Sequence, residues 1–151
     1  MVALAAGRAS LPSNFDSWDG FRVARRRRPE DTANANVNLV VLAGDSHNAW
    51  VNNLEDHKTA MGVEFTTHSV TPPGYESDLP RVSPDEMAST LLAANPHRTD
   101  VDASRRGYAS VTLTLQSATG NFHLLQTIRG CSTALRETPS LSTNFGSCRF
   151  V

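Results

Sequence analysis

The sequence predicts an α/β or α+β domain built on a β-sheet. Its 151 residues suit one ordinary domain with a sizeable core. A β-branched and aliphatic run from Val37 to Ala43 ends at Gly44, which is typical of a strand covered on both faces. Ser110–Leu115 alternates polar and apolar residues, and Phe122–Arg129 is apolar enough to pair with it. We therefore expect an antiparallel hairpin whose turn lies at Gly120-Asn121.

The remaining elements follow from shorter signals. Val63–Thr67 alternates and predicts a second strand, while Thr71–Gly74 contains two prolines and a glycine and predicts a turn or rigid loop. Residues 83–86 (Ser-Pro-Asp-Glu) are a capping box with proline at the first helical position, so a helix should begin there and stop before Pro96. From Cys131 onward the polar composition indicates an extended tail.

The charge of the chain is nearly balanced. Lys plus Arg minus Asp plus Glu is 14 − 15 = −1, so no overall field attracts the chain to nucleic acid or an anionic membrane. Residues 1–36 form an exposed polar and basic segment, and its Arg25–Arg28 run before Pro29 predicts a solvated helix end. No apolar run is long enough for a membrane-spanning helix.

The beginning of the chain and its cysteines bear on cellular location. Residues 1–7 lack the basic region and the apolar core of a secretion signal. The chain is therefore expected either to stay inside the cell or to lack its true beginning. Cys131 and Cys148 are too few for a disulfide framework and have no metal-ligand spacing, so we expect free thiols.

The segment Gly44-Asp45-Ser46-His47 offers the clearest chemistry. A carboxylate and an imidazole, two residues apart, follow a buried strand at the edge where open α/β sheets build their sites. The carboxylate is a hard oxygen ligand, and the imidazole suits Zn, Fe, Mn or Co, so the spacing predicts a metal site at Asp45 and His47. The alternative is that Asp45 caps a helix beginning near Ser46.

Two other catalytic interpretations of this segment lack their remaining parts. A GDS-type esterase would use Ser46 as a nucleophile, but no Asp-x-x-His pair follows near the C-terminus. The opening motif of a calcineurin-like metallophosphoesterase would need further Gly-Asp and Gly-Asn-His motifs downstream, and Asp45 belongs to the only Gly-Asp that follows a strand. A third possibility is that this segment is the closing motif of that superfamily.

The surrounding sequence resembles the PhoD-like alkaline phosphatase/phosphodiesterase family. About residues 10–150 take part, as an ordered series of motifs that includes the Trp-Asp-Gly segment, the Gly-Asp-x-His signature and a Ser-Val-Thr-x-Pro-Gly loop. The matching segments are residues 14–26, 38–50, 62–65 with 69–74, 93–97, 104–108 and 132–135. His68 and Pro72 depart from the family pattern, which puts a phosphate contact from that loop in doubt.

This resemblance implies a metallophosphoesterase domain. Its fold would be the C-terminal part of a mixed β-sandwich flanked by helices, with a C-terminal hairpin and tail. The intact enzyme would hydrolyse phosphate mono- or diesters with a hydroxide activated by a metal pair. Asp45 and His47 match the last metal-binding motif, and Asp45, where relatives have His, favours iron and calcium over zinc or manganese. Such enzymes are often secreted or periplasmic.

Three further residues are candidates for the substrate side of this site. Asn48 directly follows the signature, and Arg105 and Arg106 lie in a matched segment, although a solvated arginine pair is the simpler expectation. Trp18 and Trp50 are expected to serve packing or to line the rim of the site.

The family's earlier motifs, which hold most metal ligands, lie upstream of the Trp-Asp-Gly segment, so the chain resembles a C-terminal portion. We expect little or no phosphatase activity from this chain alone. Its expected partners are the missing N-terminal half of the same domain and a phosphate-ester substrate. The alternatives are a non-catalytic remnant or interaction module, and the serine esterase that uses Ser46.

Overall fold

The computed structural model describes residues 21, 23–24, 27, 31–32, 37–56 and 59–151. The chain divides into two compact units, Met1–Val37 and Asn38–Val151, and every strand and helix named below belongs to the second. The predicted basic segment 1–36 and Trp18 fall in the first unit, mostly outside the described residues. In the described part of the chain, no helix is long and apolar enough to cross a membrane.

Sheet A has four strands in the order β1-β3-β2-β4. The strands are β1 (Leu39–Ala43), β2 (Ala49–Asp56), β3 (Thr59–Thr66) and β4 (Arg98–Asp102). β1 runs parallel to β3, whereas β2 is antiparallel to both β3 and β4. The chain therefore leaves β1, makes one loop of five residues, and returns through the centre of the sheet.

Sheet B contains the predicted hairpin, but its turn lies elsewhere. The strands are β5 (Gly107–Leu113), β6 (Ser117–Leu125), β7 (Leu135–Arg136) and β8 (Leu141–Asn144), with β6 pairing to the other three. The predicted turn at Gly120-Asn121 is wrong, because Thr114 caps the real turn with its hydroxyl, which accepts hydrogen bonds from the backbone of Gln116 and Ser117. Gly120 lies inside β6, where its missing side chain leaves room for the ring of Phe65.

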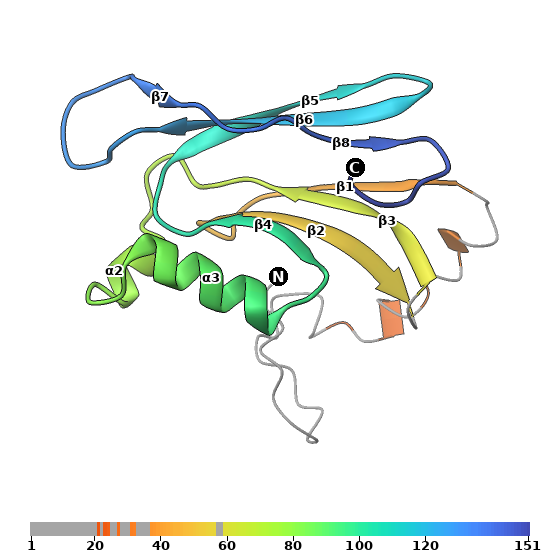
Figure 1. The fold of residues 1–151 in the computed structure, drawn as a ribbon, viewed down its shortest axis with the longest axis horizontal. Coiled ribbons are helices and arrows are strands. Elements are labelled where there is room, and N and C mark those ends of the chain that lie inside the picture. Colours follow the sequence, from red (N-terminus) through yellow and green to blue (C-terminus); the bar gives the residue numbers. More distant parts are fainter. Residues whose placement is uncertain (1–20, 22, 25–26, 28–30, 33–36, 57–58) are drawn as a thin grey trace. The chain divides into compact units, whose positions relative to one another are not determined.

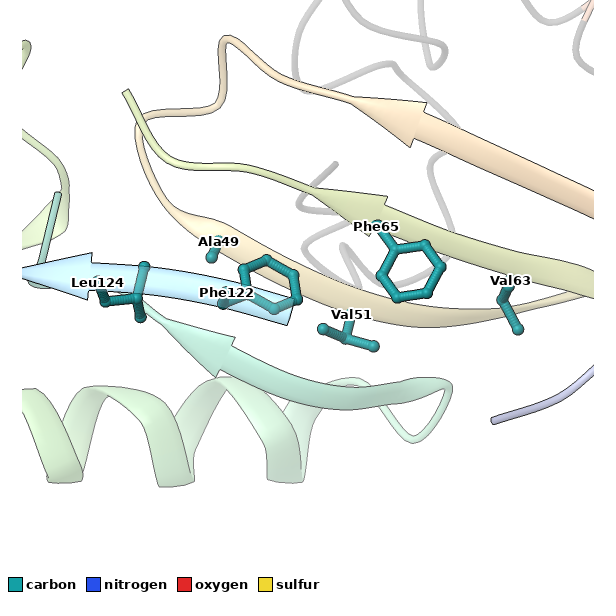
Figure 2. Close-up of a cluster of buried hydrophobic side chains, with 6 residues drawn as sticks. All are labelled: Ala49, Val51, Val63, Phe65, Phe122 and Leu124. Atoms are coloured by element: carbon teal, nitrogen blue, oxygen red, sulfur yellow. The ribbon is translucent and has the colours of Figure 1, made fainter. Parts of the chain in front are cut away.

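The core lies between the two sheets. Ala49, Val51, Val63 and Phe65 on sheet A face Phe122 and Leu124 on sheet B, and Figure 2 shows these six side chains as one cluster. The ring of Phe150, in the tail, packs edge-on against Phe65 at a centroid distance of 5.0 Å. The tail from Cys131 therefore contributes β7, β8 and a core aromatic residue in addition to extended chain.

Two helices accompany sheet A, and in Figure 1 this sheet lies between them and sheet B. They are α2 (Tyr75–Asp78) and α3 (Pro84–Ala94). The predicted start of α3 is confirmed, because the hydroxyl of Ser83 accepts a hydrogen bond from the backbone N–H of Glu86 at 3.2 Å. The helix ends before Pro96 as predicted and packs against β4. The result is a mixed β-sandwich with helices on one side.

Two expectations about the strands are wrong. β1 is not covered on both faces in the described chain, since Leu42 is 59% exposed and no residue of the strand is fully buried. A helix near Ser46 is also absent from the described chain, because β2 begins at Ala49. The sequence did not predict β2 and β4, because polar and apolar residues do not alternate cleanly in them. Cys131 and Cys148 are free thiols, as predicted.

Candidate functional site

The loop of residues 44–48 connects β1 to β2 and contains the predicted metal ligands Asp45 and His47. Both residues adopt left-handed backbone conformations, with φ angles of 62° and 59°. Non-glycine residues rarely adopt such angles, and the conformation persists only where surrounding contacts hold it. Those contacts define how the loop presents its side chains.

Hydrogen bonds within the loop use the side chains of Ser46 and Asn48. The hydroxyl of Ser46 donates to the Asn48 carbonyl at 2.6 Å and accepts from the Trp50 indole at 2.7 Å. The Asn48 amide donates to the Ser46 carbonyl at 2.9 Å. A serine nucleophile needs a base within hydrogen-bond reach, and here the hydroxyl is instead committed to a carbonyl and an indole. This geometry does not support the esterase interpretation.

His47 is held by the second loop. Its Nδ1 lies 2.9 Å from the carbonyl oxygen of Pro73. Because a carbonyl can only accept, Nδ1 carries a proton, and in the neutral imidazole this leaves the lone pair on Nε2. Metal-ligating histidines are oriented by this kind of hydrogen bond to the other ring nitrogen. The ring is half-buried, and its tautomer is the one that a metal ligand through Nε2 requires.

Asp45 is exposed and supplies the second candidate ligand. Among the residues that the structure describes, no group of three or more His, Cys, Asp and Glu side chains is arranged to hold a metal ion. An imidazole nitrogen and a carboxylate oxygen fit part of the donor set of a metal site. A metal ion at this loop therefore needs further donors from outside the described residues.

The second loop packs closely against the first. A Cβ added to Gly74 would lie 2.4 Å from Oδ1 of Asn48 and 2.8 Å from the His47 carbonyl oxygen, so only glycine fits here. The backbone N–H of Tyr75 donates to Oδ1 of Asn48 at 3.2 Å. Burial raises the pKa of the Tyr75 phenol, although the nearby Arg98 charge opposes the shift. Asn48, predicted at the substrate side, is thus buried between the loops.

Arg106 and Glu76 form an ion pair behind this contact. Arg106 is 5% exposed. Its guanidinium donates to the Glu76 carboxylate and to the Arg105 carbonyl, the latter at 2.7 Å. Burial would raise the pKa of Glu76, but hydrogen bonds from Arg106 and from the Gly74 backbone outweigh it and lower the pKa. The expectation of a solvated pair of arginines is wrong, because Arg106 is buried and paired.

Arg105 belongs to a second polar cluster, centred on Asp102. Arg105 donates to Asp102 at 2.7 Å, and Nε2 of His68 lies 3.3 Å from the other carboxylate oxygen. Burial would raise the pKa of Asp102, but hydrogen bonds from His68, from the Ser104 backbone and from Arg105 hold it well below its usual range. His68, which departs from the resembled family, is therefore a buried partner of a structural carboxylate.

A polar network that the sequence did not suggest covers the opposite face of sheet A. The guanidinium of Arg98 lies 4.1 Å from the Trp50 ring centroid and donates to Asn52 at 3.2 Å. The Asn52 amide donates in turn to Glu64 at 2.7 Å. Trp50, predicted as a packing or rim residue, is buried in this network. The network stiffens the start of β2, directly after the candidate loop.

Comparison with known proteins adds the family. A family model described as PhoD-like phosphatase matches residues 1–122. Alkaline phosphatase D of Bacillus subtilis (strain 168) is 36% identical over 112 residues, which cover 70% of this chain and 18% of that protein. A solved structure of PhoD matches with a TM-score of 0.71 and 25% identity, over 90% of this chain and 26% of that one. The chain thus spans about a fifth to a quarter of these relatives, and it belongs to the PhoD-like phosphatase family.

Proposed function

We propose that this chain forms part of a metal-dependent phosphoesterase that hydrolyses phosphate mono- or diesters. Membership of the PhoD-like phosphatase family supports a phosphoesterase function. The observation that carries the metal dependence is the contact of His47 Nδ1 with the Pro73 carbonyl, which leaves Nε2 as a ligand.

In this proposal His47 and Asp45 supply two donors of the metal site, and the remaining donors come from outside the described residues. Iron and calcium are the favoured ions, with zinc and manganese as alternatives, because the donor set includes carboxylate oxygen. A bound metal pair would polarise the phosphoryl oxygen and lower the pKa of the attacking water. Pro73 keeps the proton of His47 on Nδ1, and both candidate ligands lie in the left-handed region of the same short loop.

Fewer residues are proposed for the substrate side of the site than the sequence suggested. Asn48 is buried and accepts from the Tyr75 backbone between the loops, and Arg106 is buried and paired with Glu76. The side chain of Arg105 is 27% exposed although it pairs with Asp102. Of the three residues we therefore retain Arg105 as the candidate for a phosphate contact.

A chimera tests the proposal, because the chain alone is a small part of its relatives. The segment of the Bacillus subtilis relative that aligns with this chain is replaced by all 151 residues of this chain. Hydrolysis of p-nitrophenyl phosphate and bis(p-nitrophenyl) phosphate is then measured. We expect activity that His47→Gln lowers by at least about 10-fold, the lower end of the effect of a lost metal-site interaction. His123→Gln is the matched control, since this histidine lies on β6 and its ring stacks on Tyr108.

A folded chimera that hydrolyses neither ester would favour the alternative of a non-catalytic remnant or interaction module. Equal activity of the His47→Gln and His123→Gln chimeras would remove His47 from the site. Hydrolysis of a short acyl ester that Ser46→Ala abolishes and a chelator leaves unchanged would restore the serine esterase interpretation.

A further inference from the structure

Arg106 is buried and Glu76 is half-buried, and neither makes a polar contact with Asp45 or His47 in the described part of the chain. The pair nevertheless ends on the same peptide group as His47. The guanidinium of Arg106 binds the Glu76 carboxylate, whose two oxygens each accept from the backbone N–H of Gly74 at 3.1 Å. Gly74 precedes α2 and has no side chain with which to cap it. Glu76 instead accepts from the N–H of Gly74 itself, as the glutamate of a capping box reaches back to the N–H of the N-cap residue.

The N–H of Gly74 and the carbonyl of Pro73 are two ends of one peptide unit. The peptide is planar and trans, so its N–H and C=O point in opposite directions. Glu76 holds the N–H end at 3.1 Å, and His47 donates to the C=O end at 2.9 Å. Fixing the N–H therefore fixes the direction of the carbonyl that selects the tautomer of His47.

The close packing of the two loops leaves this peptide little freedom to move elsewhere. Gly74 already lies against Asn48 and the His47 carbonyl with no room for a methyl group. A rotation of the peptide would break the bonds to Glu76 and His47 together. The buried Arg106 in turn restricts Glu76, because a guanidinium without its carboxylate would be left uncompensated in the interior.

We propose that Glu76 and Arg106 are positioning residues of the candidate metal site, acting through the Pro73–Gly74 peptide to keep the His47 proton on Nδ1. The inference deepens the proposed function and rests on it for its catalytic meaning. It assigns Arg106 a role inside the protein in place of the substrate contact for which the sequence made it a candidate.

The test is the tautomer of His47 in the full chain without metal or substrate, measured from the ¹⁵N chemical shifts and long-range ¹H–¹⁵N couplings of the imidazole above its titration range. His47 signals are assigned with His47→Gln. The wild-type ring is expected in the Nδ1–H form. Glu76→Gln and Arg106→Gln should each lower the ratio of the Nδ1–H to the Nε2–H form by about five-fold, the factor that corresponds to one hydrogen bond.

Two further variants keep the result decisive. Glu55→Gln is the matched control, since it weakens an ion pair with Arg149 by the same chemical change, and it should leave the ratio unaltered. If a single variant loses its dispersed amide signals, the pair Glu76→Met with Arg106→Met replaces both charges by apolar groups that preserve the fold, and the same five-fold fall is expected. An unchanged ratio in folded variants overturns the proposal. Absence of hydrolysis in the chimera would contradict the proposed function while leaving this ratio as found.

Discussion

Phe65 joins the two sheets, and its removal is the sharpest test of the core. The side chain is 1% exposed and packs on Gly120 of sheet B, where a Cβ would lie 2.3 Å from its ring. It also packs edge-on against Phe150. Phe65→Ala therefore removes a ring that touches β6 and the tail at once.

The expected loss is about 3–5 kcal/mol for a buried phenylalanine, which includes about 0.5–1.5 kcal/mol for the aromatic pair. Domains of this size are stable by about 5–15 kcal/mol, so the loss is a large fraction of the total stability. With a urea dependence of about 2 kcal/mol per M, a loss of 4 kcal/mol lowers the unfolding midpoint by about 2 M.

The assay is urea unfolding followed by circular dichroism, with the wild-type chain and Phe145→Ala measured alongside. Phe145 is 72% exposed, so the same deletion there should change stability by less than about 0.5 kcal/mol. If Phe65→Ala and Phe145→Ala shift the midpoint equally, the proposed packing of the two sheets through Phe65 is wrong.

Three further changes have defined outcomes. Gly74→Ala places a Cβ 2.4 Å from Asn48 Oδ1 and should cost about 1–3 kcal/mol in urea unfolding; unaltered stability would mean that the loops do not pack as described. Ser83→Ala removes the cap of α3 and should cost about 1 kcal/mol, whereas Ser89→Ala within the helix should cost less than half of that. The folded-state pKa of Asp102 is lowered, so below about pH 4 the unfolded state binds more protons than the folded state, and stability decreases as the pH decreases. In urea unfolding at several pH values, this decrease should be steeper for the wild type than for Asp102→Asn. Equal slopes would contradict the prediction.

Local signals predicted part of the fold and missed the rest for physical reasons. The start of α3 was legible because a cap and a proline act within four residues. The strands β2 and β4 of sheet A could not be predicted in this way, because β2 buries the polar Asn52 and β4 buries Arg98. Each of these side chains is stabilised by a partner distant in sequence. Their burial depends on stacking over Trp50 and on Glu64, which no local pattern encodes.

The candidate site divides in the same way. His47 could be named from its spacing after a strand, since the motif is local. Arg106 was named only as a candidate for the substrate side, and Glu76 was not named. Their relation to His47 passes through a backbone peptide and an ion pair between residues 30 positions apart in sequence. The one sequence signal near them was the Pro-Gly step at residues 73–74, which predicted a rigid loop without its function.

Metal content tests the central claim most directly. The purified chimera and its His47→Gln and His123→Gln variants are analysed by inductively coupled plasma mass spectrometry after equilibration with iron and calcium. We expect the His47→Gln chimera to hold less metal per chain than the other two, in proportion to its loss of hydrolysis. Equal metal content in all three would contradict a metal-binding role for His47.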